Sequence, residues 1–318
     1  EGKGPLRECF DKICRDDTLG LDSWEQAESR MFESAVRVAL AKIKRQSDDL
    51  SCLLGGDLLN QIISSGFAAR EIRAPFIGLY GACSTISEGL MLGGMLVDGG
   101  FAELAACAAS SHFSAAERQF RYPLEMGVQA VPSSQRTVTG AGSIIIQAAG
   151  EFRPGAGNVF EHVALTGGTI GSVEDFGITD ANNMGAAMAP AAFKTIKTHL
   201  SDYSRRVEDY DRIITGDLGI FGSDMLYELL RGEGIEIADR HEDCGKLMFG
   251  PEQNVNCGAS GCGCAATIMS SWFLPKIESG EIRRVLFLAT GALMSPVSSL
   301  QGESIPSIAH AVVIEHID

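Results

Sequence analysis

The clearest repeating pattern of apolar positions lies near the N-terminus, between residues 23 and 44. Apolar side chains recur there at the three- and four-residue spacing of one helix face: Trp24, Ala27, Met31, Ala35, Val38 and Ala39. Ser23 and Gln26 stand at the two positions of a capping box, which satisfies free backbone N–H groups at a helix start. The pattern predicts a long amphipathic helix over about 23–44.

Short apolar runs follow this helix, separated by helical or Gly-rich segments. They cover residues 50–55, 75–80 and 103–109. Runs of this length, bounded by Gly and turn residues, are typical of buried strands. Strands that alternate with helices predict a largely parallel sheet covered on both faces.

The same order of segments returns in the second half of the chain. Residues 52–58 (Cys-Leu-Leu-Gly-Gly-Asp-Leu) match residues 212–218 (Arg-Ile-Ile-Thr-Gly-Asp-Leu) at an offset of 217 − 57 = 160. Residues 81–84 (Gly-Ala-Cys-Ser) are echoed by residues 258–261 (Gly-Ala-Ser-Gly) at an offset of 258 − 81 = 177. Both echoes come just before a predicted helix.

Two apolar strands complete the repeat, because 104–110 and 143–147 return at offsets near 180 and 168. Four echoes in the same order indicate duplication of one α/β unit. We therefore predict two halves, residues 1–150 and 151–318, with a boundary near Gly150 to Gly157 and a shared core.

The net charge and the length of the apolar stretches argue against two classes of protein, those that bind nucleic acid and those that span a membrane. Against 26 Lys and Arg stand 41 Asp and Glu, a net charge of −15 that repels nucleic-acid phosphates. The longest apolar stretches, such as 285–294, are shorter than the roughly 20 residues needed to cross a bilayer. We expect a protein that does not bind nucleic acid and has no transmembrane segment.

The chain has nine Cys, an odd number, and most stand singly in apolar strings. This pattern is typical of free core thiols in a reducing compartment. Cys244, Cys257, Cys262 and Cys264 form a loose cluster. Their spacing does not match the paired ligands of structural zinc, so we expect no metal site and buried small residues instead.

Cys83 carries the main chemical hypothesis. It follows a predicted strand, lies in Gly-Ala-Cys-Ser-Thr and precedes a predicted helix, which is the arrangement of a nucleophile elbow. At a helix N-terminus, free N–H groups favour the thiolate, so we expect a lowered pKa for Cys83. The alternative is an inert buried cysteine.

A thiolate that attacks a thioester needs an imidazole within hydrogen-bond reach. Of the six His, His112 follows a strand that should end at the pocket, and His310 precedes the last strand. These two are the candidate pocket imidazoles. The others are interpreted as surface or structural residues: His162, His199, His241 and His316.

Nine strings spread over nearly the whole chain resemble the stage V sporulation protein AD family of spore-forming bacteria. They are residues 56–61, 76–85, 98–102, 110–123, 188–192, 243–245, 261–264, 289–292 and 305–310. The resemblance implies a thiolase-like α/β fold, with two duplicated βαβ-type halves packed into a layered αβαβα core. It also implies that the first strand of the first half lies upstream of Glu1.

The resemblance further implies a binding protein rather than an enzyme. Its ligand would be dipicolinate (pyridine-2,6-dicarboxylate), alone or as its calcium chelate, with no other cofactor. Condensing enzymes of this fold carry a His after the strand aligned with residues 213–216, where this chain has Asp217, and a His, Asn or Cys where it has Ser260-Gly-Cys262. An Asp near neutral pH replaces an imidazole only after a large pKa shift, so the condensing machinery looks incomplete.

A dicarboxylate calls for planar, bidentate cations, and Arg118 and Arg121 are the candidates. The alternative is that both are solvated surface charges. Asp57 and Asp217, at matching strand ends, are candidates to hold calcium or to cap the next helix. The expected ligand-binding residues are Cys83, His112, Arg118, Arg121, Asp217, Cys262 and His310.

The family resemblance implies that the protein acts in the developing spore, peripheral at the spore inner membrane, and we expect membrane proteins of the dipicolinate uptake system as its partners. We also expect a homodimer in which Ala-rich segments such as 104–110 pack across a two-fold axis. Two alternatives remain. One is an acyltransferase or β-ketoacyl-synthase-like enzyme that uses Cys83, and the other is a structural subunit that docks on membrane partners.

Overall fold

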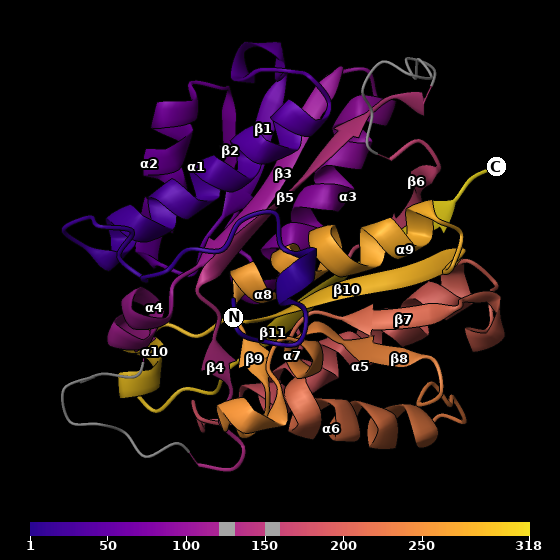
Figure 1. Ribbon diagram of the computed structural model, residues 1–318. Helices are drawn as coiled ribbons and strands as arrows, with labels where there is room; N and C mark the ends of the chain where they lie inside the picture. Colours follow the sequence, from indigo (N-terminus) through magenta and orange to yellow (C-terminus); the bar gives the residue numbers. More distant parts are fainter. Residues whose placement is uncertain (121–130, 150–159) are drawn as a thin grey trace.

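The computed structural model describes residues 1–120, 131–149 and 160–318, which form two β-sheets between layers of helices (Figure 1). The helix expected at 23–44 is α1, Trp24–Lys42, and the side chain of Ser23 accepts a hydrogen bond from Gln26 N at its start. The predicted amphipathic helix is therefore confirmed.

The first sheet has the strand order β2-β1-β3-β5. Its strands are β1 Cys52–Gly56, β2 Phe76–Gly78, β3 Leu104–Ser111 and β5 Gly140–Gln147. β2, β1 and β3 are parallel, whereas β5 runs antiparallel to β3 and forms one edge. The three strands predicted in the first part of the chain are confirmed.

The second sheet has the order β6-β11-β10-β7-β8. Its strands are β6 Val163–Thr169, β7 Arg212–Thr215, β8 His241–Asp243, β10 Arg284–Ala292 and β11 Ser307–His316. β8, β7 and β10 are parallel, while β11 and β6 are each antiparallel to their neighbour. Each sheet is thus parallel in one part and antiparallel at one edge.

Helices lie on both faces of each sheet (Figure 1). Helix α3 (Thr85–Asp98) contacts both sheets, and α8 (Cys262–Ile268) lies beside it. Helices α1 and α2 (Ile63–Ile72) cover the outside of the first sheet, and α5 (Met184–Asp202) and α6 (Gly219–Arg231) that of the second. The result is the predicted αβαβα layering.

Shorter elements complete the described chain. They are α4 Phe113–Phe120, β4 Arg136–Thr137, α7 Cys244–Leu247, β9 Ala259–Ser260, the π-helical turn Met269–Phe273, α9 Leu274–Glu278 and α10 Pro296–Leu300, with 3₁₀ turns Arg7–Cys9, Ser47–Asp49, Asn60–Ile62, Ala82–Ser84, Val207–Asp209 and Pro251–Gln253. In the described residues no helix is both long and apolar enough to span a bilayer.

Strand register agrees with the duplication. Cys52 pairs with Ala105 in the first sheet, and Arg212, 212 − 52 = 160 residues later, pairs with Val285, 285 − 105 = 180 residues later. Ala105 also pairs with Ile146, and Val285 pairs with Ile314, at an offset of 314 − 146 = 168. These are the offsets found in the sequence. The boundary expected near Gly150 to Gly157 falls outside the described residues.

The segment expected at a dimer interface lies inside the first sheet. β3, which contains 104–110, is paired with β1 on one side and β5 on the other, and all eight of its residues are buried. It cannot pack across a two-fold axis, so this part of the dimer prediction is wrong. The edge of this sheet beside β1 is instead β2, where Ile77 is 42% exposed.

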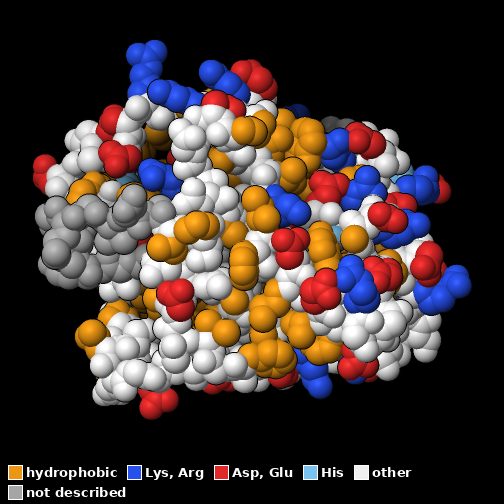
Figure 2. Space-filling view, turned by 90° about the horizontal axis from the view of Figure 1, so that it is seen from below, with side chains coloured by type: hydrophobic (Ala, Val, Ile, Leu, Met, Phe, Trp, Pro, Cys, Tyr) orange, Lys and Arg blue, Asp and Glu red, His pale blue; other side chains and the backbone are white. Residues whose placement is uncertain are grey.

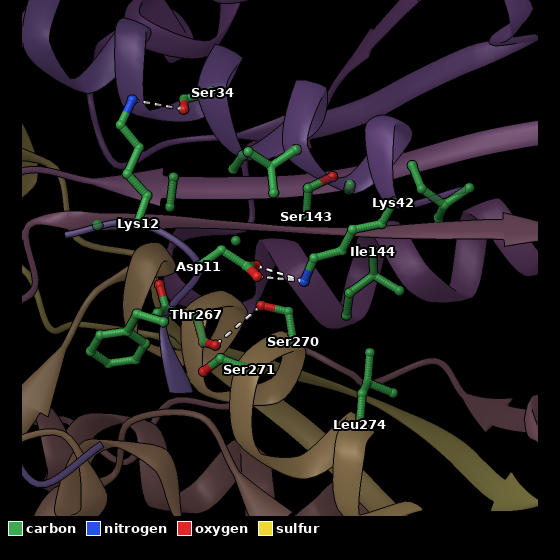
Figure 3. A pocket seen from close by; sticks show the side chains of 18 of the residues that line it. Asp11, Lys12, Ser34, Lys42, Ser143, Ile144, Thr267, Ser270, Ser271 and Leu274 are labelled. Carbon is green, nitrogen blue, oxygen red and sulfur yellow. Dashed lines mark hydrogen bonds and ion pairs between the residues drawn. The ribbon is translucent and has the colours of Figure 1, made fainter. Parts of the chain in front are cut away.

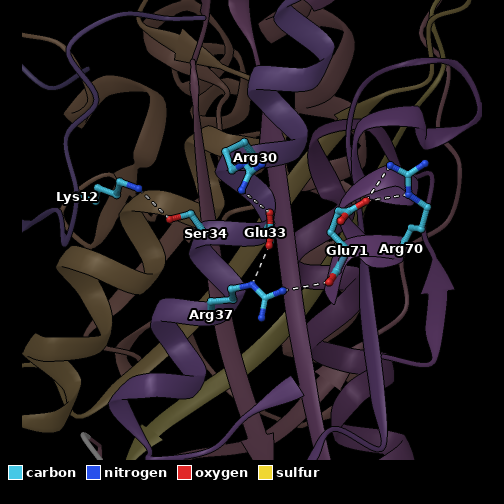
Figure 4. A network of polar contacts seen from close by, with 7 residues as sticks. All are labelled: Lys12, Arg30, Glu33, Ser34, Arg37, Arg70 and Glu71. Carbon is cyan, nitrogen blue, oxygen red and sulfur yellow. Dashed lines mark hydrogen bonds and ion pairs between the residues drawn. The ribbon is translucent and has the colours of Figure 1, made fainter. Parts of the chain in front are cut away.

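Polar contacts join the two outer helices of the first half (Figure 4). Glu33 forms ion pairs with Arg30 and Arg37 along α1. Arg37 also donates a 3.0 Å hydrogen bond to the backbone carbonyl of Glu71 in α2. Exposed pairs of this kind contribute little stability, so the contact mainly fixes how α2 lies against α1.

Candidate functional site

The turn that carries Cys83 is strained and closely packed. Ala82 has a left-handed φ of 50°, which is uncommon for a residue with a side chain and typical of a functional elbow. Ser84 Oγ donates a 2.6 Å hydrogen bond to the carbonyl of Gly81 and fixes the turn. A Cβ atom on Gly291 in β10 would lie 2.2 Å from that same carbonyl, so the turn packs directly on the second sheet.

Asp217 lies directly behind the thiol of Cys83. It follows β7, is fully buried, and its carboxyl group is hydrogen-bonded to the thiol. It also accepts bonds from Gly261 N (2.8 Å) and from Thr290 Oγ1 (3.0 Å). The fold thus brings the predicted residues Cys83 and Asp217, from opposite halves, into contact.

Burial decides the protonation of this pair. It raises the pKa of Asp217 to about 7, since a charged carboxylate is poorly solvated there. Burial also raises the pKa of Cys83 well above its usual range, and the neighbouring carboxyl group of Asp217 raises it further. The prediction of a lowered thiol pKa is therefore wrong: desolvation outweighs the stabilising effect of the helix N-terminus.

A pocket of about 360 Å³ opens over Cys83 between the two halves. Its walls are mainly apolar, from Leu58, Tyr80, Ala82, Ala116, Phe120, Met184, Met188, Ala292, Leu293 and Met294, with polar groups from Asn60, Glu117, Thr137, Ser260 and Ser295. Among the lining residues that the structure describes there is no Lys, Arg or His. The pocket suits a small, flat, largely apolar group.

Neither candidate imidazole lines this pocket. The Nδ1 atom of His112 accepts from Ser114 N, so its Nε2–H donates to the carbonyl of Asp17 at 2.8 Å and the ring is neutral. His310, on β11, accepts from Gly171 N at Nδ1. Burial lowers the pKa of His310, which keeps it neutral as well. Both rings are bonded to backbone groups, away from Cys83.

Of the two candidate arginines, the structure describes only Arg118. Arg118, on α4, forms an ion pair with Glu25, and its guanidinium lies 5.2 Å from the ring centroid of Trp24. It is not among the described residues that line the pocket. Arg121 lies outside the described residues, so its contact with a ligand stays a prediction.

Cys262 and Asp57 have structural partners. Cys262 begins α8, is fully buried, and donates from Sγ to the carbonyl of Ala82 at 2.9 Å, beneath the elbow. Asp57 accepts from Leu59 N and from both N and Oγ of Ser65. Of the two roles considered for Asp57, the contacts correspond to capping of α2.

Two residues that hold the backbone around Asp217 were not identified from the sequence. Asp243 accepts from Leu218 N and Gly219 N and so holds the turn that carries Asp217. The amide Nε2 of Gln135 donates to the carbonyl of Asp217 at 2.6 Å and to that of Ala259 at 2.8 Å. Asp243 lay in a string used for the family resemblance, but no local signal marked Gln135.

Comparison with known proteins agrees with the geometry. The family model described as stage V sporulation protein AD matches residues 1–315. The stage V sporulation protein AD of Bacillus subtilis (strain 168) is 44% identical over 315 residues, which cover 99% of this chain and 90% of that protein. The chain belongs to the stage V sporulation protein AD family.

Solved structures place this member of the stage V sporulation protein AD family in the thiolase-like fold. The 3-oxoacyl-[acyl-carrier-protein] synthase III of Aquifex aeolicus VF5 is 11% identical, covers 91% of this chain and 84% of that chain, and has a TM-score of 0.57. OleA of Xanthomonas campestris is 12% identical, with coverages of 98% and 90% and a TM-score of 0.60. At these identities the likeness shows the fold alone.

Proposed function

We propose that this protein binds dipicolinate in the pocket over Cys83 and does not catalyse a reaction there. The observation that carries the proposal is the partner of the thiol, which is a buried carboxyl group of Asp217 rather than an imidazole. A raised thiol pKa leaves almost no thiolate near neutral pH, and a thiol without a base is a poor nucleophile. The expected ligand is the one that the resemblance in the sequence implies, and the match to the stage V sporulation protein AD family supports that resemblance.

The pocket fits one form of this ligand better than the other. Its volume of about 360 Å³ and its Met-rich walls suit an aromatic ring, because thioethers pack favourably against ring edges. The described lining offers one ionisable carboxyl, Glu117, and no cation. Free dipicolinate is a dianion, whereas its calcium chelate is neutral. We therefore propose that the chelate binds more tightly.

Calorimetric titration tests this function. We expect saturable binding of dipicolinate, and tighter binding when equimolar calcium is present. Arg121→Ala should lose about one to two decades of affinity if Arg121 contacts a carboxylate. Arg118→Ala is the matched control, and we expect it to bind as the parent does because its guanidinium is engaged with Glu25. A folded protein that binds neither form would contradict the proposal.

The proposal extends to the cell. We infer that binding serves uptake of dipicolinate into the developing spore, with the protein peripheral at the spore inner membrane and in contact with membrane proteins of the uptake system. Its support is the family match together with apolar side chains on the face that carries α6 (Figure 2). Ile220 and Phe221, at the start of α6, are 50% and 52% exposed there.

We further propose a homodimer, now through the β2 edge of the first sheet. Ile77 on β2 and Phe67 on the adjacent α2 are 42% and 45% exposed, and an unpaired strand edge is a template for pairing with a second copy. Light scattering at micromolar concentration should give twice the chain mass, and Ile77→Lys should reduce it to one chain. A monomer mass for the parent protein would contradict the proposal.

A second candidate function is acyl transfer through Cys83. The left-handed Ala82 favours it, because strained elbows mark nucleophiles. Incubation with acyl-CoA followed by mass spectrometry of the Cys83 peptide distinguishes the two functions. A stable or turning-over acyl adduct supports the enzyme, and no adduct supports the binding protein.

A further inference from the structure

The pocket over Cys83 has one acidic side chain among its described lining residues, that of Glu117. Glu117 lies on α4 and is only 7% exposed. Its Oε1 atom accepts a 2.8 Å hydrogen bond from Thr137 Oγ1, on β4. A short polar side chain on a neighbouring element therefore holds this carboxyl group in the wall of the pocket.

Further oxygen atoms lie beside this carboxyl group. Thr137 is paired with Ser260 in the ladder formed by β4 and β9, and residues paired in this way direct their side chains to the same face. Ser260 is buried and also lines the pocket. Glu117, Thr137 and Ser260 thus form one continuous stretch of the lining, with a carboxyl group and two hydroxyl groups.

The apolar part of the lining comes from other elements. Met184 and Met188 lie one turn apart on α5, and Leu293 and Met294 follow β10. Thioether groups make favourable contacts with aromatic rings. The lining is therefore divided into a stretch that presents oxygen atoms and a separate apolar stretch.

The calcium chelate of dipicolinate has the same division. Its ring nitrogen and two carboxylate oxygens hold the ion at one edge, while the far edge of the ring carries only C–H groups. Calcium takes about 6–8 ligands, and carboxylate oxygens are among those it prefers. Because dipicolinate supplies three, the ion keeps open positions that water fills in solution. Free dipicolinate presents no such cation to a carboxylate.

The ion would enter this pocket with its chelator and not alone. Within residues 1–120, 131–149 and 160–318, no group of three or more His, Cys, Asp or Glu side chains is placed to hold a metal ion. One carboxyl group and its neighbouring hydroxyl groups are too few ligands for bare calcium. They are enough to complete the coordination of an ion that dipicolinate already holds.

We propose that Glu117 is a direct ligand of the calcium ion when calcium dipicolinate occupies the pocket over Cys83. This inference rests on the proposed function, since it concerns the same pocket and the same ligand. Carboxylate oxygen of Glu117 takes the place of coordinated water, which is released, and Thr137 keeps its hydrogen bond to the other oxygen. The ring lies against the methionines of α5. Glu117 is then the residue that makes the pocket select the chelate over the free dianion.

A larger groove beside β5 provides a comparison (Figure 3). It has a volume of about 1080 Å³, and its lining carries charges of both signs. Asp11 and Lys42 point toward one another there, with oxygen and nitrogen 2.6 Å apart. Cations of this kind attract a free dianion, so Lys42→Ala distinguishes binding in the groove from binding over Cys83.

Calorimetry with calcium dipicolinate, and with dipicolinate in calcium-free buffer, measures the selectivity. Glu117→Gln keeps an oxygen that accepts from Thr137 but removes the charge. We expect it to weaken binding of the chelate by about one to two decades and not to weaken binding of free dipicolinate. Glu25→Gln is the matched control, because Glu25 pairs with Arg118 outside the described lining. This variant and Lys42→Ala should bind both forms as the parent does.

Terbium dipicolinate gives a readout on the parent protein itself. Tb³⁺ prefers oxygen ligands as Ca²⁺ does, the ring transfers its excitation to the ion, and luminescence lifetimes in H₂O and D₂O count the coordinated waters. We expect the equimolar chelate to lose about one or two waters on binding the parent, as one carboxylate binds through one or both oxygens, and fewer on binding Glu117→Gln. Circular dichroism checks that each variant is folded.

Two results would overturn the assignment of Glu117 while leaving the proposed function in place. One is a chelate that binds the parent and keeps all its coordinated waters. The other is a folded Glu117→Gln protein that binds both forms of the ligand as the parent does. If the parent binds neither form, the proposed function itself is wrong, and the assignment of Glu117 fails with it.

Discussion

Asp57 and Asp217 stand at matching positions in the two halves, yet they do different things. Asp57 accepts hydrogen bonds within its own half, from Leu59 and Ser65 at the start of α2. Asp217 faces the thiol of Cys83 from the other half, and the turn that follows it is held by Asp243 instead. A second buried acid takes over the structural role, so that the first can take part in the site.

The two elbows differ in the same way. Cys83 follows a left-handed Ala82 and lies in a tight turn, whereas its counterpart Ser260 belongs to the short strand β9, which pairs with β4. Both residues line the pocket. Duplication thus gives the pocket two similar walls. Local differences between the two elbows place the thiol on one wall and a hydroxyl group on the other. The predictions below test this asymmetry.

The largest expected effect concerns the pH dependence of stability. Burial raises the pKa of Asp217 from 3.8 to about 7, so the folded state binds a proton that the unfolded state releases. The stability due to this proton is fully present below about pH 4 and is lost as pH rises through about 7, a change on the order of 4 kcal/mol. Asp217→Asn, which stays neutral, should flatten that part of the profile.

Urea unfolding between pH 4.5 and pH 8 measures this profile. The slope is the readout, because loss of the Gly261 and Thr290 bonds in Asp217→Asn lowers stability equally at every pH. Burial also raises the pKa of Asp243, to about 6, so part of the slope should persist in the variant. If the stability of the parent and of Asp217→Asn depends on pH in the same way, the pKa of Asp217 is not raised in the folded protein.

A smaller effect is expected at the second elbow. Gly261 has a φ of 105°, and a Cβ atom there would lie 2.7 Å from Ser111 Oγ. Gly261→Ala should therefore lower the free energy of unfolding by about 1–3 kcal/mol. Ser84 holds the matching position in the first elbow with ordinary helical geometry, so Ser84→Ala should cost about 1 kcal/mol, the value of one hydrogen bond. Equal losses would show that the elbows are equivalent.

Most of the fold could be predicted from the sequence, because hydrophobic periodicity and the four echoes depend on local residue order. The offsets of 160, 180 and 168 reappear as strand register. The antiparallel edges could not be predicted in this way, since a buried apolar run such as that in β5 reads the same in either direction.

The site was harder to predict than the fold. The position of Cys83 in a tight turn was recognisable from its small neighbours, but its pKa depends on burial and on Asp217, 134 residues later, which no local pattern reveals. Arg118 was chosen for its chemistry alone. The structure shows that Glu25 and Trp24 already engage it.

The smallest expected effect is also the most direct test of the central claim, that Cys83 marks a binding pocket and not a nucleophile. Calorimetry with dipicolinate should be done on three proteins in a background where the exposed Cys14 and half-exposed Cys9 are changed to Ser: unmodified, Cys83→Ser, and alkylated at Cys83 by prolonged treatment with iodoacetamide at alkaline pH, because the raised pKa of Cys83 leaves little reactive thiolate near pH 7. The account predicts that Cys83→Ser loses about 1 kcal/mol or less, since a hydroxyl keeps the shape and hydrogen bond, while the adduct abolishes binding. Unchanged affinity after complete alkylation of Cys83 would contradict it.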